Sequence, residues 1–228
     1  RQSLQAGTGW TGGINVTALR MLEDRAFGWF HAYSSAFPIG EQKRLVLNRT
    51  FTGTLTGLSK LPYLRDTRRS VGLEGFRLTH ADQSTPSNVS ASNSHDAAQV
   101  GKRFYDTVAL GNYPADDHGL DTCKTPSYMN SSRTLPFYIP FRALTHRDMD
   151  NLLVAGKVMA TTFYANSATR LHPAEWTSGA AAGAAAALLA SNQNNHSTTA
   201  DLLAEGIPRL QRMLAKAGVP LDWTLSNK

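Results

Sequence analysis

The chain has 228 residues, of which 41% are hydrophobic and 18% are charged, so it is long enough to bury a core. Its most apolar stretch, Gly179 to Ala190, is shorter than the roughly eighteen apolar residues that cross a bilayer. The formal net charge of +6 comes from scattered Lys and Arg residues, so we expect neither a membrane nor a nucleic acid as a partner.

The amino-terminal part predicts one amphipathic helix behind a glycine-rich loop. Apolar residues recur at three- to five-residue spacing over residues 17–31, with charged residues between them, which is typical of a helix. The loop Gly7 to Gly13 reads G-T-G-W-T-G-G, but no strand precedes it. Because a dinucleotide fingerprint stands between a strand and a helix, we do not interpret it as a phosphate loop.

The middle of the chain predicts strands that are separated by loops. Apolar and polar residues alternate over 44–56 and over 70–79, which favours strands there. Residues 80–101 are rich in Ser, Asn, Asp and Ala and predict a long surface loop. Two further strands are expected at 104–110 and at 135–141, the second at a sheet edge because it contains prolines.

The last third predicts a strand followed by two helices. Asn151 to Gly156 is a short apolar run that ends in Gly, the form of a parallel strand buried on both faces. Residues 174–190 predict an Ala- and Gly-rich helix that begins at Pro173 and can lie very close to a sheet. A final amphipathic helix is expected at 207–216, ended by Gly218.

Several features predict a secreted, extracellular glycoprotein. Cys123 is the only cysteine, so it can pair only with another chain or remain a buried thiol. The chain begins at Arg1 without an initiator Met or a signal-like apolar core, so we expect that it is cut from a longer secreted precursor. The glycosylation pattern N-x-S/T occurs at Asn15, Asn48, Asn88, Asn130 and Asn195.

Four segments, in the order of a known family, carry a resemblance that covers more than half of the chain. They are L-P-Y-L-R-D-T-R-R-S-V-G at 61–72, V-A-L-G-N-Y-P-A-D-D-H at 108–118, P-F-Y-I-P-F-R-A-L at 136–144, and N-L-L-V-A-G-K followed by A-T-R-L-H-P-A-E-W-T-S-G-A-A-A-G at 151–183. With these segments the chain resembles the FAD-dependent oxidoreductases of the glutathione-reductase-like superfamily, in their carboxy-terminal portion.

The resemblance implies the fold class and the division of the chain. We expect an α/β protein with an α+β substrate region, in which the final strand and helix complete a Rossmann-like domain of a two-domain FAD-binding flavoprotein. Residues 1–145 would then form the substrate side, 146–192 would complete the FAD-binding domain, and 193–228 would form a carboxy-terminal helical segment. No G-x-G-x-x-G follows a strand, so we expect a separate chain or fragment to carry the amino-terminal half that holds FAD.

The resemblance also implies which residues hold the cofactor. The start of a helix stabilises negative charge, so the helix at Pro173 would face the pyrimidine ring of the flavin. Lys157 stands where related proteins often have Asp, and it would meet a phosphate instead. The implied cofactor-binding residues are Gly156, Lys157, Arg170, Pro173, Trp176, Thr177, Ser178 and Gly179.

Two histidines are candidate catalytic bases for an oxidation, in which a base takes the proton of a hydroxyl or an amine. His118 follows Asp116 and Asp117, which could orient its ring, and it could equally be a loop residue hydrogen-bonded to the structure. His172 precedes the helix at Pro173 and could instead be structural. The acidic residues near His118 lack further metal ligands at a supporting spacing, so we expect no metal site.

The arginines at 65, 68 and 69 could bind an acidic substrate or, as we favour, pin parts of the structure together. The function expected from the resemblance is oxidation of a small organic substrate by hydride transfer to flavin N5. In that function this chain would close the FAD site and form much of the substrate pocket. The alternative is a noncatalytic secreted glycoprotein module that keeps only the shape of a flavoprotein.

Overall fold

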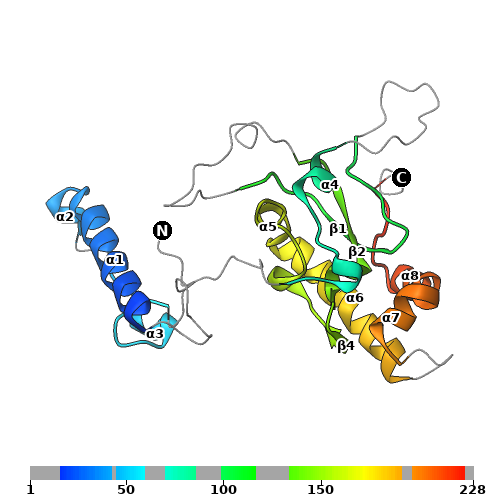
Figure 1. Ribbon diagram of the computed structural model, residues 1–228. Helices are drawn as coiled ribbons and strands as arrows, with labels where there is room; N and C mark the ends of the chain where they lie inside the picture. Colours follow the sequence, from blue (N-terminus) through cyan, green and yellow to red (C-terminus); the bar gives the residue numbers. More distant parts are fainter. Residues whose placement is uncertain are drawn as a thin grey trace. The chain divides into compact units, whose positions relative to one another are not determined.

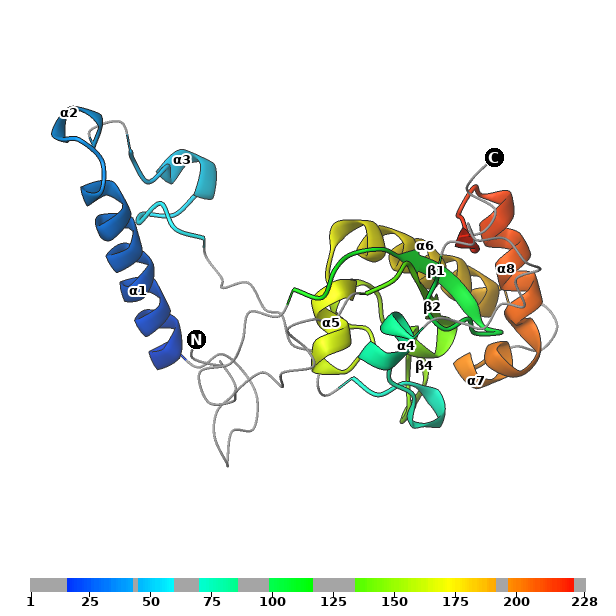
Figure 2. The same ribbon diagram turned by 90° about the horizontal axis from the view of Figure 1, so that it is seen from above.

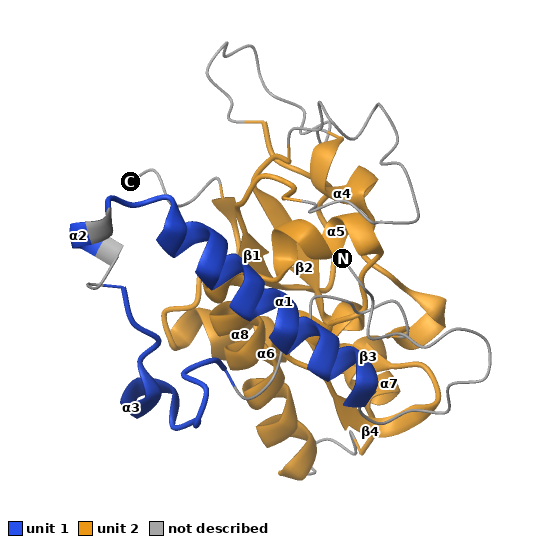
Figure 3. Ribbon diagram, turned by 90° about the vertical axis from the view of Figure 1, so that its left-hand side faces the viewer, with its two compact units in different colours: residues 1–64, 120–124 blue, residues 65–119, 125–228 orange. Residues whose placement is uncertain are grey.

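A computed structural model describes residues 16–42, 45–59, 70–85, 99–116, 134–191 and 197–223 (Figure 1). The chain divides into two compact units, which Figure 3 shows in different colours. Unit 1 comprises residues 1–64 and 120–124, and unit 2 comprises residues 65–119 and 125–228. We describe each unit by itself.

Unit 1 is built on helix α1 (Val16–Ser35), followed by the short helices α2 (Ile39–Gln42) and α3 (Arg49–Thr52). The helix expected at 17–31 is confirmed. An open, mostly apolar hollow of about 500 Å³ lies between α1 and the segment around α3. None of the site residues expected from the sequence lines this hollow.

The strand expected at 44–56 is wrong, because local capping decides the conformation there. Asn48 accepts the backbone N–H of Phe51 at 2.8 Å through its side chain and so begins α3. Gly53, with φ of 62°, ends the helix in the left-handed conformation. The alternation of apolar and polar residues in this segment therefore does not mark a strand.

Unit 2 mixes helices with two small antiparallel sheets, in agreement with an α/β class (Figure 2). Its elements in chain order are η1 (Leu73–Gly75), α4 (His80–Ser84), β1 (Thr107–Gly111), β2 (Phe137–Pro140), η3 (Phe141–Leu144), β3 (Thr145–His146), β4 (Met149–Leu153), η4 (Gly156–Val158), α5 (Phe163–Thr169), α6 (His172–Ala190), α7 (Thr199–Asp201), the π-helical turn η6 (Leu202–Gly206) and α8 (Ile207–Lys216).

The core of unit 2 forms where α6 packs on β1 and α8 packs on α6. The strands expected at 104–110 and 135–141 are confirmed as β1 and β2, which pair antiparallel and are buried along their length. The helices expected at 174–190 and 207–216 are confirmed as α6 and α8. The buried face of α6 consists mainly of small side chains, at Ala174, Ser178, Ala181, Ala182, Ala185 and Leu188.

The strand expected at 70–79 is wrong over most of its length. The chain turns through η1, where Glu74 has φ of 58° and Gly75 has φ of 73°. Only Leu78 pairs as a strand residue does, in a parallel bridge to Thr161. The loop expected from residue 80 begins with α4, which Thr79 and Asp82 cap reciprocally.

The buried parallel strand expected at 151–156 is also wrong. A tight turn after His146 sends the chain back on itself, so β4 pairs antiparallel with β3. Residues 149–152 of β4 are exposed, and only Leu153 packs against the core. The apolar run then leaves the strand, and Gly156 begins η4.

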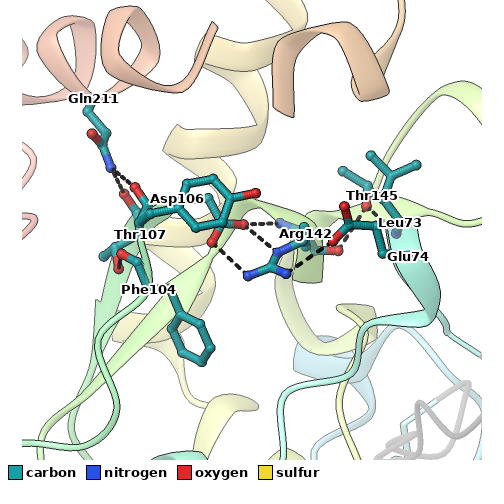
Figure 4. A network of polar contacts seen from close by, with 9 residues as sticks. Leu73, Glu74, Phe104, Asp106, Thr107, Arg142, Thr145 and Gln211 are labelled. Atoms are coloured by element: carbon teal, nitrogen blue, oxygen red, sulfur yellow. Dashed lines mark hydrogen bonds and ion pairs between the residues drawn. The ribbon is translucent and has the colours of Figure 1, made fainter. Parts of the chain in front are cut away.

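A polar network ties β1, η1, η3 and α8 together (Figure 4). Arg142 bonds Asp106 and Glu74, and Gln211 on α8 donates to the carbonyl oxygens of Tyr105 and Thr107. No described helix is long and apolar enough to cross a membrane. The described residues also contain no group of His, Cys, Asp and Glu side chains that could hold a metal ion.

Candidate functional site

The candidate site lies where η4 meets the first two turns of α6. Gly156 has φ of 71°, in the left-handed region that glycine tolerates, and its N–H donates to Ser178 Oγ at 3.3 Å. Ser178 is buried and donates in turn to the carbonyl oxygen of Glu175 at 3.1 Å. These two hydrogen bonds hold the turn after β4 against the start of α6.

A carboxylate joins two of the expected site residues. Glu175 Oε1 lies 3.1 Å from Lys157 Nζ, and Glu175 Oε2 lies 3.1 Å from His172 Nδ1. The carbonyl oxygen of Lys157 accepts from Asn166 Nδ2 at 3.1 Å, so α5 fixes the same turn from its other side. Lys157 is therefore held at both its backbone and its side chain.

The start of α6 carries no capping side chain. Its N-cap is Leu171, which cannot accept a hydrogen bond through its side chain, and Pro173 follows in the first turn. Glu175 is the acidic residue of this turn, and Lys157 from η4 pairs with it. The first turn of α6 therefore brings backbone amide donors close to the side-chain cation of Lys157.

Arg170 connects the site to the segment that leads toward His118. It is 8% exposed, and its guanidinium donates to the carbonyl oxygen of Asp116 and lies 3.9 Å from the Asp116 carboxylate. His118 itself lies outside the described residues. The structure thus brings the segment before His118 to the loop between α5 and α6.

The remaining expected residues divide between the two faces of α6. Thr177 faces the sheet and donates to the carbonyl oxygen of Leu110 in β1 at 3.2 Å. Trp176 is 82% exposed, and a Cβ built on Gly179 meets open space. Trp176 is therefore directed to solvent, and Gly179 has open space beside it.

Sequence reasoning missed Glu175 and Asn166. Lys157 and Glu175 stand eighteen positions apart, and an acid in the first turn of a helix is common for electrostatic reasons alone. Asn166 on α5 meets Lys157 only because of the turn at η4. No periodicity in the chain marks either contact.

The donors at this site suit an anionic group. Lys157 Nζ, the His172 ring and the backbone amides of His172 and Ala174 carry N–H groups, whereas Pro173 between them has none, and the side chain of His172 is 91% exposed. Gly156 leaves space for an added Cβ, whose nearest neighbour would be Glu175 Cγ at 3.9 Å. The site is therefore open and rich in donors, as binding of a phosphate or of an anionic ring edge requires.

Of the glycosylation acceptors, Asn48 alone lies within the described residues, where it is exposed. Asn15, Asn88, Asn130 and Asn195 lie outside them, as do the arginines at 65, 68 and 69 and Cys123.

Comparison with family models gave one match, to the family described as FAD dependent oxidoreductase, over residues 36–214. The match covers more than half of the chain and includes η4, α5 and α6. Searches of curated proteins and of solved structures gave no match.

Proposed function

The chain belongs to the FAD dependent oxidoreductase family, and from this membership we propose that it is part of a secreted enzyme that oxidises a small organic substrate. FAD is the cofactor of the family, and when bound it accepts a hydride from the substrate at flavin N5. In this proposal the chain closes the FAD site and forms much of the substrate pocket.

The observation that carries the proposal is the cluster at the start of α6. Lys157 provides a cation, and the uncapped end of α6 provides amide donors beside it. Both stabilise negative charge, which is what a phosphate or an electron-rich flavin ring presents. Ser178 and Asn166 hold the turn that carries Lys157, so the cation stays near the helix end.

Two histidines remain candidates for the base in this reaction. His172 begins α6 with its ring exposed, within reach of a ligand at the helix end. His118 stands two residues after Asp116 in the sequence, and Arg170 binds Asp116 next to the loop between α5 and α6. Each would take a proton from the substrate hydroxyl or amine.

We further propose that a separate chain or fragment carries the amino-terminal half of the FAD site. Among the described residues β4 pairs only with β3, and Met149 and Leu152 on β4 are 49% and 37% exposed. A free strand edge with exposed apolar side chains is a surface that favours pairing with another strand. A mass spectrum of the native protein that shows this chain by itself, without such a partner, would contradict this part of the proposal.

The test of the FAD site compares two lysines that each pair with a carboxylate. Lys157→Met removes the cation at α6, while Lys102→Met removes a cation that lies 3.4 Å from Asp82 of α4. We expect Lys157→Met to weaken FAD binding by about tenfold, because a hydrogen bond to a charged group contributes about 1.5 kcal/mol. Lys102→Met should leave FAD binding unchanged.

FAD binding is measured by the visible absorbance and fluorescence of the flavin in the native protein. Equal FAD affinity in both variants would remove Lys157 from the site. A native protein without flavin absorbance would contradict the enzyme and favour the noncatalytic glycoprotein module.

A further inference from the structure

Glu175 is the centre of the cluster at the start of α6. Its two carboxylate oxygens have different partners, Lys157 Nζ on Oε1 and His172 Nδ1 on Oε2, each at 3.1 Å. The Glu175 side chain is 22% exposed and that of Lys157 is 27% exposed. The carboxylate is thus fixed by a cation that comes from a different element, and not by the helix alone.

The chemistry of the carboxylate decides which ring nitrogen of His172 carries the proton. An ionised carboxylate only accepts hydrogen bonds, and Oε1 of Glu175 already pairs with Lys157 Nζ. The contact on Oε2 therefore requires a proton on His172 Nδ1. In the neutral ring Nε2 then has the free lone pair, and this ring is 91% exposed.

We propose that Glu175 is a positioning residue that holds His172 in the Nδ1–H tautomer, so that Nε2 faces the substrate as the proton acceptor. The proposal rests on the proposed function for the identity of the reaction. When His172 takes a proton at Nε2, the ring becomes a cation with N–H groups on both nitrogens, and Glu175 balances its charge.

The fixed backbone around Glu175 distinguishes this arrangement from an ordinary contact along a helix surface. A simple pair at i and i+3 needs one carboxylate oxygen and leaves both side chains free to move. Here Lys157 holds the second oxygen, and Ser178 links the Glu175 carbonyl oxygen to the N–H of Gly156. The carboxylate is thereby tied to η4 as well as to α6.

His146 provides a contrast within the same unit. Its Nδ1 accepts the backbone N–H of Asp148 at 3.1 Å, so in the neutral ring its proton is on Nε2. His146 and His172 are therefore expected to have opposite tautomers. A single spectrum of the ring nitrogens reports the tautomers of both histidines.

The test uses the native protein with ¹⁵N-labelled histidine rings, whose nitrogen chemical shifts distinguish a protonated from a bare ring nitrogen. His172→Gln and His146→Gln assign the two signals. At a pH where both rings are neutral, we expect the Nδ1–H form for His172 and the Nε2–H form for His146. Glu175→Leu should move His172 toward the Nε2–H form and leave His146 unchanged.

Kinetics then separate positioning from a purely structural role. We expect Glu175→Leu to lower kcat by about 10²-fold with a smaller change in KM, because misplacing a catalytic group has an effect of that order. Glu175→Asp should restore part of kcat, because it keeps a carboxylate with two accepting oxygens. Glu205→Gln, at an exposed acid on η6, is the control that should keep full activity.

Failure of this inference and failure of the proposed function give different results. A yellow protein in which His172 has the Nε2–H form, or in which Glu175→Leu leaves its tautomer unchanged, overturns the role of Glu175 alone. If Glu175→Leu does not fold, the Nδ1–H form in both the wild type and Glu175→Asp still supports the role of Glu175, and a different wild-type tautomer overturns it. A colourless native protein overturns the proposed function and with it the role of His172 as a base.

Discussion

Asp106 and Arg142 meet edge to edge, with Arg142 Nε 3.0 Å from Oδ2 and Nη2 3.2 Å from Oδ1 of the carboxylate (Figure 4). The Asp106 side chain is fully buried, and that of Arg142 is 17% exposed. The backbone N–H of Arg142 also donates to Asp106 Oδ2 at 3.1 Å. The pair fixes the end of β2 against the start of β1.

Removing the Arg142 side chain should therefore destabilise unit 2 strongly. Arg142→Met leaves a buried carboxylate without its cation, which lowers the free energy of unfolding by about 3 to 5 kcal/mol. Arg147→Met is the matched control, because Arg147 makes the same two-bond contact with Asp148 on an exposed turn. Urea unfolding should show a large loss for the first variant and little change for the second. A similar loss of unfolding free energy in both variants would mean that the burial of Asp106 does not determine the effect.

His80 should make the stability of unit 2 fall in weak acid. Among the described residues no partner bonds its two buried ring nitrogens, and burial lowers the pKa of His80 below 6.5, while the neighbouring Gln83 opposes this change. As the pH falls below 6.5, the unfolded chain takes up the proton first, so stability is lost down to the pKa of the folded state. Above 6.5 the ring is neutral in both states and contributes no pH dependence.

We expect His80→Phe to reduce the difference in urea midpoint between about pH 5 and about pH 7.5. His31→Phe, at an exposed position on α1, should leave this difference unchanged. If His80→Phe keeps the full pH dependence, another group causes it.

Asn48 offers a test of secretion that does not disturb the fold. Its Oδ1 caps α3, and a glycan would attach to the side-chain nitrogen, so the cap and the glycan are compatible. In protein secreted from eukaryotic cells, we expect a glycosidase to remove mass at Asn48. Asn48→Asp keeps the cap but not the acceptor, and Thr50→Ala removes the acceptor pattern and leaves Asn48 in place.

Both of these variants should lose the mass step at Asn48 and keep the unfolding behaviour of the wild type. An unmodified Asn48, together with unmodified Asn15, Asn88, Asn130 and Asn195, would remove the support for a secreted protein.

Elements with a long or strictly local pattern could be predicted from the sequence. The helix α1 has a sustained apolar period, α6 has Pro in its first turn, and α8 precedes Gly218, whose φ is 79°. The strands β1 and β2 are apolar runs bounded by turn residues. In each case the local preference agrees with the packing.

The strand expected at 151–156 is wrong because a short apolar run can pair with other strands in more than one way. Leu152 and Leu153 suit a buried parallel strand as well as a hairpin, and the turn after His146 decides for the hairpin. Residue Glu74 adopts a left-handed conformation that its residue type does not favour, so the bend at η1 was not visible in the pattern.

The contacts of the candidate site could not be assembled from the sequence. The structure brings the segments around Gly156 and Pro173 together, but the contacts of Lys157 with Glu175 and Asn166 depend on three elements that meet in space. Such contacts have no period along the chain. The roles of His118 and His172 stay predictions.

The segment from α8 to Trp223 packs into the core of unit 2, and this has a consequence for synthesis on the ribosome. Trp223 Nε1 donates to the carbonyl oxygen of Phe137 at 3.0 Å across 86 positions, and Leu210 and Leu214 of α8 pack in the same core as Val108. At about 5 to 20 residues per second, roughly 4 to 17 seconds separate translation of β2 from that of Trp223. During that interval the apolar faces of β1 and β2 lack their final cover. The nascent protein is therefore exposed to aggregation until α8 and Trp223 emerge, and a truncation before α8 would make that state permanent.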